Sequence, residues 1–196
     1  AERYVDIAAL FPAEQMAAMR EYYSKLVSLG FMRFGDNQVK NRYWLHNEPV
    51  ASYVHRELSE LINLITGENL IPAYCYAAAY TEGADLKPHL DREQCEYSVS
   101  FQVDYQPQQK DHTSPWALSV AIPGRDLGGR KAFSWDEFYS DKDLCGDTRP
   151  INLRSGDALF YKGCELLHFR KELPKGATST SLFLHYVPEG FESDLN

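Results

Sequence analysis

The chain has 196 residues, of which 44% are hydrophobic and 13% are aromatic. This composition is enough to build the core of one folded domain and excludes a disordered chain. The formal net charge of −8 argues against a protein that binds the phosphate backbone of nucleic acid, because such proteins usually carry a basic face. We expect a single domain over residues 1–196 that binds no nucleic acid.

The cysteines and the apolar segments indicate the compartment in which the protein is expected. The four cysteines lie far apart, without the close pairing of a zinc knuckle or a disulfide framework, at Cys75, Cys95, Cys145 and Cys164. Reduced thiols are the simpler interpretation. No apolar run approaches the roughly 18–20 residues that a membrane span needs, and the first residues given show no basic-plus-apolar pattern of a secretion signal. We therefore expect a cytoplasmic protein that does not bind a membrane.

The first third of the chain predicts two amphipathic helices. Between Pro12 and Gly30, apolar residues recur at spacings of three and four, with proline in the first turn and glycine at the end. A second helix is expected from Asn47, as its N-cap, to Gly67. We therefore expect residues 1–69 to form a helical support that packs on one face of a sheet.

After Gly67 the pattern changes to short segments typical of strands, separated by turn residues. The expected strands are 71–80, 96–105, 116–122, 149–153, 157–161, 165–170 and 180–187. Several strands without intervening helices predict a sandwich or barrel, whose core we place at residues 70–190. The stretch 124–148 is rich in glycine, aspartate and lysine and is expected to be a surface loop, with one helical turn at 135–139.

A His-x-Asp or His-x-Glu pair can share a metal ion only if both side chains point the same way. Three such pairs are present, namely His46 with Glu48, His55 with Glu57, and His89 with Asp91. The first pair flanks a helix start, where a glutamate interacts favourably with the helix dipole. The second pair lies within a helix, where the side chains of residues two apart point about 200° away from each other around the axis. Only His89 and Asp91 follow a turn between strands, where extended backbone puts positions i and i+2 on one side.

A facial triad of two histidines and one carboxylate needs a second imidazole from a later strand, and it leaves three coordination positions open. His168 is the best candidate, because its strand comes just after the turn at Gly156 and the buried strand 157–161. A buried core histidine is the alternative interpretation of this residue. His112 falls in a polar loop, and His185 is expected to be a core histidine or a contact of the site.

Two strings of the sequence resemble the prolyl-4-hydroxylase-like branch of the 2-oxoglutarate/Fe(II) dioxygenases. The string Tyr80-x-x-Gly83-x-x-x-x-x-His89-x-Asp91 resembles the entry to the metal site of that family. The string Ser-Gly-Asp-Ala-Leu-Phe at 155–160 resembles the strand that precedes the distal histidine. Residues 89–96, 161–170 and 183–187 look like a bacterial and viral branch of the same superfamily.

This resemblance covers roughly residues 70–190 and implies a fold, a cofactor set and a reaction. The implied fold is mainly β, a double-stranded β-helix (jelly-roll, cupin-like) barrel with two N-terminal helices. The implied catalytic centre is Fe(II) held by His89, Asp91 and His168, with 2-oxoglutarate as cosubstrate and O2 as oxidant. The implied reaction hydroxylates an unactivated C–H bond of a small molecule, amino acid or peptidyl residue and releases succinate and CO2.

The sequence departs from the family at the residue that anchors the far carboxylate of 2-oxoglutarate. Prolyl hydroxylases carry lysine or arginine there, whereas this chain carries Thr178. A buried carboxylate without a partner is costly, so we expect a cation from elsewhere. Arg170 is the preferred candidate, because it lies two residues beyond His168 on the same strand; a salt bridge to an acidic neighbour is the alternative. Arg92 is the second choice, and Tyr80 and Thr178 are expected to add neutral hydrogen bonds.

The same three metal ligands are also compatible with functions other than an iron oxygenase. They could hold zinc, manganese or nickel in a cupin-like isomerase or hydrolase, or a metal in a non-catalytic sensor. A small-molecule or peptidyl substrate is expected in either enzyme. No residue of the sequence selects that substrate or an oligomeric state.

Overall fold

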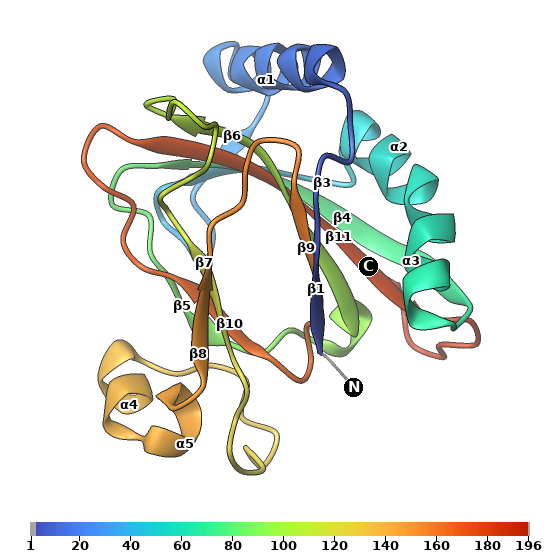
Figure 1. Cartoon of the computed structure of the whole chain (residues 1–196), viewed down its shortest axis with the longest axis vertical. Coiled ribbons are helices and arrows are strands. Elements are labelled where there is room, and N and C mark those ends of the chain that lie inside the picture. The colour runs from blue at the N-terminus through green and yellow to red at the C-terminus, as the bar shows by residue number, and fades with distance from the viewer. Residues whose placement is uncertain (1–2, 196) are drawn as a thin grey trace.

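Two antiparallel sheets face each other in the computed structural model of the protein, which describes residues 3–195 (Figure 1). The larger sheet has the order β1 (Tyr4–Ile7), β9 (Ala158–Lys162), β6 (Tyr97–Gln106), β11 (Thr178–Pro188), β4 (Leu70–Thr81), β3 (Arg42–His46) and β2 (Arg33–Phe34). The smaller sheet has the order β5 (Leu86–His89), β10 (Leu167–Arg170), β7 (Leu118–Ala121) and β8 (Thr148–Ile151). This mainly β arrangement is consistent with the expected jelly-roll fold.

Strand β6 shows how the sequence gives the larger sheet two different faces. Its residues alternate between apolar and polar, and side chains of successive strand residues point to opposite faces. Val99 and Phe101 belong to the core under the N-terminal helices, whereas Ser98, Ser100 and Gln102 are buried on the opposite face. The interior between the sheets is therefore lined in part by buried polar groups, which an apolar core would not contain.

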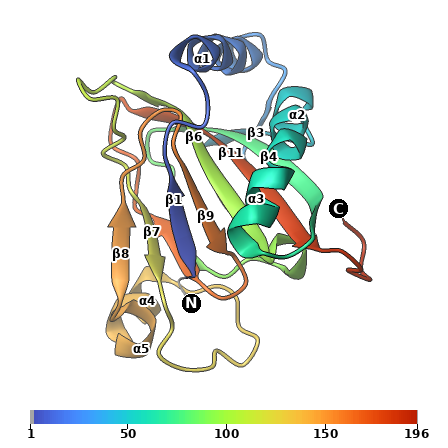
Figure 2. The same cartoon turned by 45° about the vertical axis from the view of Figure 1, so that its right-hand side comes forward.

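Three helices cover the outer face of the larger sheet, namely α1 (Ala13–Ser28), α2 (Pro49–Glu57) and α3 (Ser59–Thr66) (Figure 2). The expectation of two N-terminal helices was incomplete, because the second helix divides at Leu58. The break is local: Leu58 N–H donates to the Val54 carbonyl and Ile62 N–H donates to the Leu58 carbonyl. The predicted end of this helix at Gly67 is confirmed, with the glycine in the left-handed conformation (φ 70°).

The N-terminal part of the chain also supplies three strands that we did not expect. Strand β1 pairs with β9, so that Tyr4 lies opposite Tyr161, and β3 pairs with β4, so that Arg42 lies opposite Tyr80. Both strands are short and lack a long alternating pattern, and β1 finds its partner more than 150 residues further along the chain. Pairing over such a distance depends on the assembled sheet rather than on local sequence.

All seven strands expected after residue 67 are confirmed within a few residues, and β5 is added to them. The expected helical turn at 135–139 is helix α4 (Trp135–Ser140), followed by α5 (Lys142–Cys145); a 3-10 turn, Glu93–Cys95, precedes β6. Phe138 of α4 packs edge-to-face on Phe169 of β10, so α4 covers the outer face of the smaller sheet. No helix within residues 3–195 is long and apolar enough to cross a membrane.

Candidate metal centre and adjoining cavity

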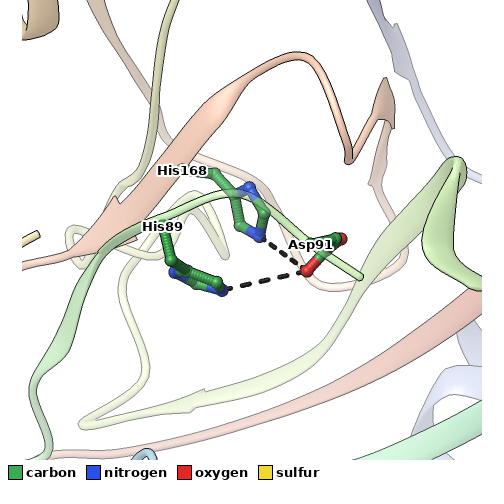
Figure 3. A group of neighbouring side chains, drawn as sticks. All are labelled: His89, Asp91 and His168. Atoms are coloured by element: carbon green, nitrogen blue, oxygen red, sulfur yellow. Dashed lines mark ion pairs between the residues drawn. The ribbon is translucent and has the colours of Figure 1, made fainter. Parts of the chain in front are cut away.

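His89, Asp91 and His168 come together between the two sheets (Figure 3). His89 is the last residue of β5, Asp91 follows two residues later, and His168 lies on β10 directly opposite His89 in the antiparallel register. The pairing of β5 with β10 thus brings the early and the late part of the motif together. Sequence reasoning expected these three residues to converge, and the structure places them side by side.

Distances between the ligand atoms are compatible with one shared ion. His168 Nε2 lies 3.3 Å from Asp91 Oδ1, and His89 Nε2 lies 3.9 Å from the same oxygen. The two imidazole ring centroids are 4.2 Å apart. The ligand atoms all lie within 4.8 Å of one another, so two nitrogens and one oxygen can contact a single ion, and they are the donor set of a facial triad.

Backbone carbonyls orient both imidazole rings. His89 Nδ1 lies 2.8 Å from the Lys87 carbonyl oxygen, and His168 Nδ1 lies 3.0 Å from the Leu166 carbonyl oxygen. A carbonyl only accepts hydrogen bonds, so each Nδ1 carries a proton and each Nε2 is the ring nitrogen that faces Asp91 and the metal position. Fixing the tautomer in this way is the usual role of the groups behind metal-binding histidines.

The ionisation of the triad also favours a cation. Burial, together with the neighbouring His168, lowers the pKa of His89 to about 4, so this ring is neutral at pH 7. Burial opposes the ionisation of Asp91, yet the positive charge and hydrogen bond of His168 hold its pKa below the usual range. Burial also opposes the charged form of His168, but Asp91 outweighs it and raises the His168 pKa. A metal ion would take the place of that proton.

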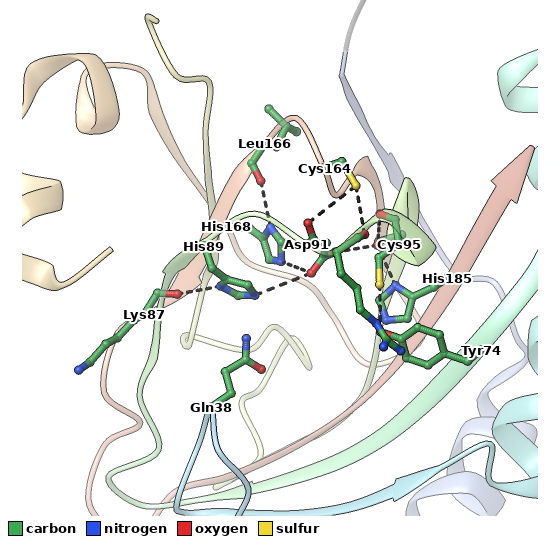
Figure 4. Close-up of polar contacts among 12 residues, drawn as sticks. Gln38, Tyr74, Lys87, His89, Asp91, Cys95, Cys164, Leu166, His168 and His185 are labelled. Atoms are coloured by element: carbon green, nitrogen blue, oxygen red, sulfur yellow. Dashed lines mark hydrogen bonds and ion pairs between the residues drawn. The ribbon is translucent and has the colours of Figure 1, made fainter. Parts of the chain in front are cut away.

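A second polar network lies behind Asp91 (Figure 4). Ser98 Oγ donates to Asp91 Oδ2 at 3.0 Å and lies 2.9 Å from His185 Nδ1. Gly163, in the turn between β9 and β10, lies so close that a Cβ atom there would collide with Asp91 Oδ2 and Ser98 Oγ. Glycine at this position is therefore required by the close approach of the turn to the carboxylate.

A cavity of about 530 Å³ opens beside the triad, within the range of small-molecule sites. Its wall includes Trp44 and Tyr76, whose rings stack with centroids 5.4 Å apart. Arg42 also lines the cavity, but its guanidinium is paired with Asp36 and donates to the Tyr80 hydroxyl at 3.1 Å. These residues come from the segment that we had described as helical support, and the sequence of β3 has no apolar and polar alternation that would have indicated them.

Arg170 projects into the same interior from β10. Its side chain is 1% exposed, it lies over the Trp116 ring, and its Nη1 donates to the Trp116 carbonyl at 2.6 Å. Within residues 3–195, Nε and Nη2 have no hydrogen-bond partner and no carboxylate forms an ion pair with this guanidinium. Burial lowers the Arg170 pKa to about 10, so the side chain stays charged at pH 7. Arg170 lies next to Tyr80 and Tyr161, which line the cavity.

The other three expected cofactor contacts lie in different places. Tyr80 is buried on β4 and lines the cavity. Arg92 lies at the cavity edge, where its Nε donates to the Tyr74 hydroxyl at 3.2 Å. Thr178 begins β11 with an exposed side chain and lies outside the cavity lining, because the inward positions of this strand are Ser179, Ser181 and those that alternate with them. The structure therefore brings Tyr80, Arg92 and the triad together and leaves Thr178 apart.

The chain was compared with known protein families, curated sequences and solved structures, and only the solved structures are similar to it. No family model and no curated protein sequence matches the chain. Among solved structures, a Pseudomonas putida prolyl-4-hydroxylase superposes with a TM-score of 0.67 at 14% identity, covering 97% of this chain and 95% of its own. The fold is that of the 2-oxoglutarate/Fe(II) oxygenases. The family resemblance of the sequence is thereby confirmed at the level of the fold.

Two further oxygenase-fold structures extend the similarity. AviO1 from Streptomyces viridochromogenes Tue57 superposes with a TM-score of 0.70 at 15% identity, covering 98% of this chain and 93% of its own. HygX from Streptomyces hygroscopicus superposes with a TM-score of 0.66 at 12% identity, covering 96% of this chain and 84% of its own. The HygX structure holds nickel, 2-oxoglutarate and hygromycin B. Identities this low relate the chains by fold alone.

Proposed function

We propose that this protein is a 2-oxoglutarate- and Fe(II)-dependent dioxygenase that hydroxylates a C–H bond of a small-molecule or peptidyl substrate. The observation that carries the proposal is the convergence of His89, Asp91 and His168 beside a cavity. Two neutral imidazoles and one carboxylate form the donor set of non-haem iron oxygenases that keep open coordination positions. The similar solved structures, one of which holds 2-oxoglutarate, support the same reaction class.

The donor set fits a divalent ion of borderline character. Both imidazoles offer Nε2 with the tautomer already set by backbone carbonyls, and Asp91 offers Oδ1. Iron in this position would supply the oxidising chemistry with dioxygen and a 2-oxo acid. The residues around it bind the ion, orient its ligands and shape the cavity in which the substrate lies.

Arg170 fits the distal carboxylate of 2-oxoglutarate better than any other cation near the cavity. Its Nε and Nη2 are buried donors without partners within residues 3–195, and a carboxylate would satisfy both. Arg42, in contrast, already pairs with Asp36. Two buried hydroxyls on the interior face, those of Ser100 and Ser181, also lack partners in the described part of the chain and could join such a contact.

His168 and Arg170 alternate along β10, so both side chains face the interior while Phe169 packs outward on α4. A cosubstrate of two carboxylates would therefore run along this strand from the metal toward the guanidinium. Tyr80 and Tyr161 lie beside this path and exclude water from it, because both side chains are buried. Arg92, at the cavity edge, is placed to contact the substrate rather than the cosubstrate.

The test is release of succinate from 2-oxoglutarate by protein reconstituted anaerobically with Fe(II) and then exposed to oxygen. We expect succinate with iron and none with zinc at equal occupancy. The His168→Ala variant serves as the inactive control and His112→Ala, in an exposed loop, as the matched active control. Tight zinc binding without binding of 2-oxoglutarate would replace the proposal with a zinc-dependent cupin-like enzyme or a metal sensor.

A further inference from the structure

The two oxygens of the Asp91 carboxylate have different surroundings. Oδ1 faces the Nε2 atoms of His168 and His89, at 3.3 Å and 3.9 Å. Oδ2 points away from them and accepts a hydrogen bond from Ser98 Oγ at 3.0 Å. One oxygen is thus directed at the metal position and the other is held by the protein.

The hydroxyl of Ser98 is itself held in place by His185. A hydroxyl has one proton, and the carboxylate of Asp91 can only accept, so Ser98 donates to Oδ2. His185 Nδ1, 2.9 Å from Ser98 Oγ, must then carry a proton and donate it to that oxygen. A second contact of Ser98, to the Cys95 carbonyl, is longer at 3.4 Å. Ser98 is fully buried and His185 is 6% exposed, so water does not compete for these bonds.

Asp91 also belongs to a second possible ligand set. Donor atoms of Asp91, Cys95 and His185 all lie within 4.8 Å of one another, and this set shares only Asp91 with the first. A thiolate, an imidazole and a carboxylate suit zinc and other thiophilic ions better than they suit an oxygen-activating iron. In the structure these donors are engaged: His185 Nδ1 by Ser98, and Cys95 Sγ by the Tyr74 hydroxyl at 3.0 Å.

We propose that Ser98, oriented by His185, is a positioning residue that commits Asp91 Oδ2 to the protein and Oδ1 to the metal. By the same bond it keeps the Asp91, Cys95 and His185 set closed to thiophilic ions. The proposal rests on the proposed function, since it takes the first set as the working metal site. It explains why two buried polar side chains, Ser98 and His185, lie behind a metal ligand that needs only one of its oxygens for the ion.

The first experiment compares metal binding by wild type and by Ser98→Ala, with Fe(II) or Co(II) alone. We expect Ser98→Ala to bind Fe(II) on the order of 10- to 100-fold more weakly, the usual effect of losing a group behind a metal ligand. We also expect Co(II) to show thiolate-to-metal charge-transfer absorption in Ser98→Ala and not in wild type. This absorption should vanish in the double variant Ser98→Ala/Cys95→Ser.

The second experiment separates the hydrogen bond of His185 from its bulk. In His185→Asn the amide nitrogen occupies a place like that of Nδ1, whereas in His185→Gln it lies one bond further out. We expect the asparagine variant to retain Fe(II) affinity within about 3-fold and the glutamine variant to lose as much as Ser98→Ala. Thermal unfolding of the metal-free variants checks that all of them are folded.

Three results would overturn the proposal. They are unchanged Fe(II) affinity in Ser98→Ala, equal affinity in the asparagine and glutamine variants, and thiolate absorption in wild type. These readouts need no 2-oxoglutarate, so they are independent of turnover. Wild-type protein that binds Fe(II) with the expected dependence on Ser98 but releases no succinate would contradict the proposed function and leave this proposal intact.

Discussion

Two buried charged groups on opposite sides of the larger sheet differ in how completely they are satisfied. On the outer side, Glu48 caps α2 and accepts four hydrogen bonds, from the hydroxyls of Tyr22 and Tyr23 and from two backbone N–H groups. Between the sheets, Arg170 makes one hydrogen bond and has two nitrogens without a partner in residues 3–195. Both side chains are almost fully buried, at 3% and 1% exposure.

The number of hydrogen-bond partners separates a buried charge that serves the fold from one that is available to a ligand. A buried group without partners is costly, so a protein that needs it only for stability saturates it, as Glu48 is saturated. An arginine with two free donors beside a ligand cavity lowers stability until an anion binds. The comparison predicts that changes on the inner side affect binding and changes on the outer side affect folding.

Loss of a proposed metal ligand on the inner side should have the largest effect. We expect His168→Ala to lower Fe(II) affinity by more than the roughly 100-fold limit seen for groups behind the ligands, and to abolish succinate release. The fold should persist, because the ring is bounded by the cavity. Anaerobic Fe(II) titration measures the affinity, with His112→Ala as the matched control. Wild-type affinity in His168→Ala would remove this residue from the metal site.

Substitution of Arg170 should weaken the binding of 2-oxoglutarate without weakening the binding of the metal. We expect Arg170→Ala to raise the KM for 2-oxoglutarate on the order of 100-fold, because a buried charged hydrogen-bond partner is lost, while Fe(II) affinity changes little. Arg92→Ala should leave this KM within about 5-fold, since that side chain lies at the cavity edge. A large rise in Arg92→Ala and none in Arg170→Ala would transfer the anchor to Arg92.

On the outer side, substitution of Glu48, whose carboxylate is fully hydrogen-bonded, should lower the stability of the fold instead. We expect Glu48→Ala to lower the free energy of unfolding by about 3 kcal/mol, because the helix loses its N-cap and two tyrosine hydroxyls lose their acceptor. Urea unfolding of the metal-free protein measures this loss. The Glu48→Ala protein that remains folded should still turn over 2-oxoglutarate at the wild-type rate. A loss of unfolding free energy below about 0.5 kcal/mol would show that the hydrogen bonds of Glu48 contribute little to stability.

The smallest effect concerns the pH dependence of stability on the outer side. Burial lowers the pKa of His55 to about 4, and its Nε2 donates to the His185 carbonyl at 2.8 Å. Because the unfolded state keeps the ordinary pKa of about 6.5, the unfolded chain gains a proton first as pH falls. This residue should therefore cost about 2 kcal/mol of stability between pH 7.5 and pH 5.

Substitution of His55 isolates that contribution from those of other buried histidines. His55→Gln places an amide N–H near Nε2 but does not titrate. The difference in unfolding free energy between wild type and His55→Gln should fall by that amount over the same pH interval in metal-free protein. A difference that does not vary with pH would show that His55 is not buried in the neutral form.

Much of the site could be predicted because its residues lie in patterns that local geometry decides. His89 and Asp91 are two apart after a turn, and helical geometry excluded the pair His55 and Glu57, which indeed lies in α2. The strands after residue 67 follow from alternation and turn residues. The predicted N-cap, Asn47, was wrong by one residue, because Glu48 caps α2 and accepts from the backbone N–H groups of Val50 and Ala51. The expected interaction of Glu48 with the start of this helix is confirmed by these two bonds.

Features that depend on pairing over long distances could not be predicted. Nothing near Arg42 or Trp44 indicates that β3 joins the larger sheet and contributes to the cavity. The bond from His185 to Ser98 spans 87 residues and arises only because β11 and β6 pair in one register. Thr178 was expected near 2-oxoglutarate from the family pattern, but strand alternation turns its side chain outward.

The central claim is that His89, Asp91 and His168 bind one iron ion through two imidazole nitrogens and a single carboxylate oxygen. Anomalous diffraction at the iron edge, from crystals grown anaerobically with Fe(II) and 2-oxoglutarate, tests it most directly. We expect one peak roughly 2.0–2.2 Å from His89 Nε2, His168 Nε2 and Asp91 Oδ1. A peak on Cys95 and His185, or none within bonding distance of His168, would contradict it.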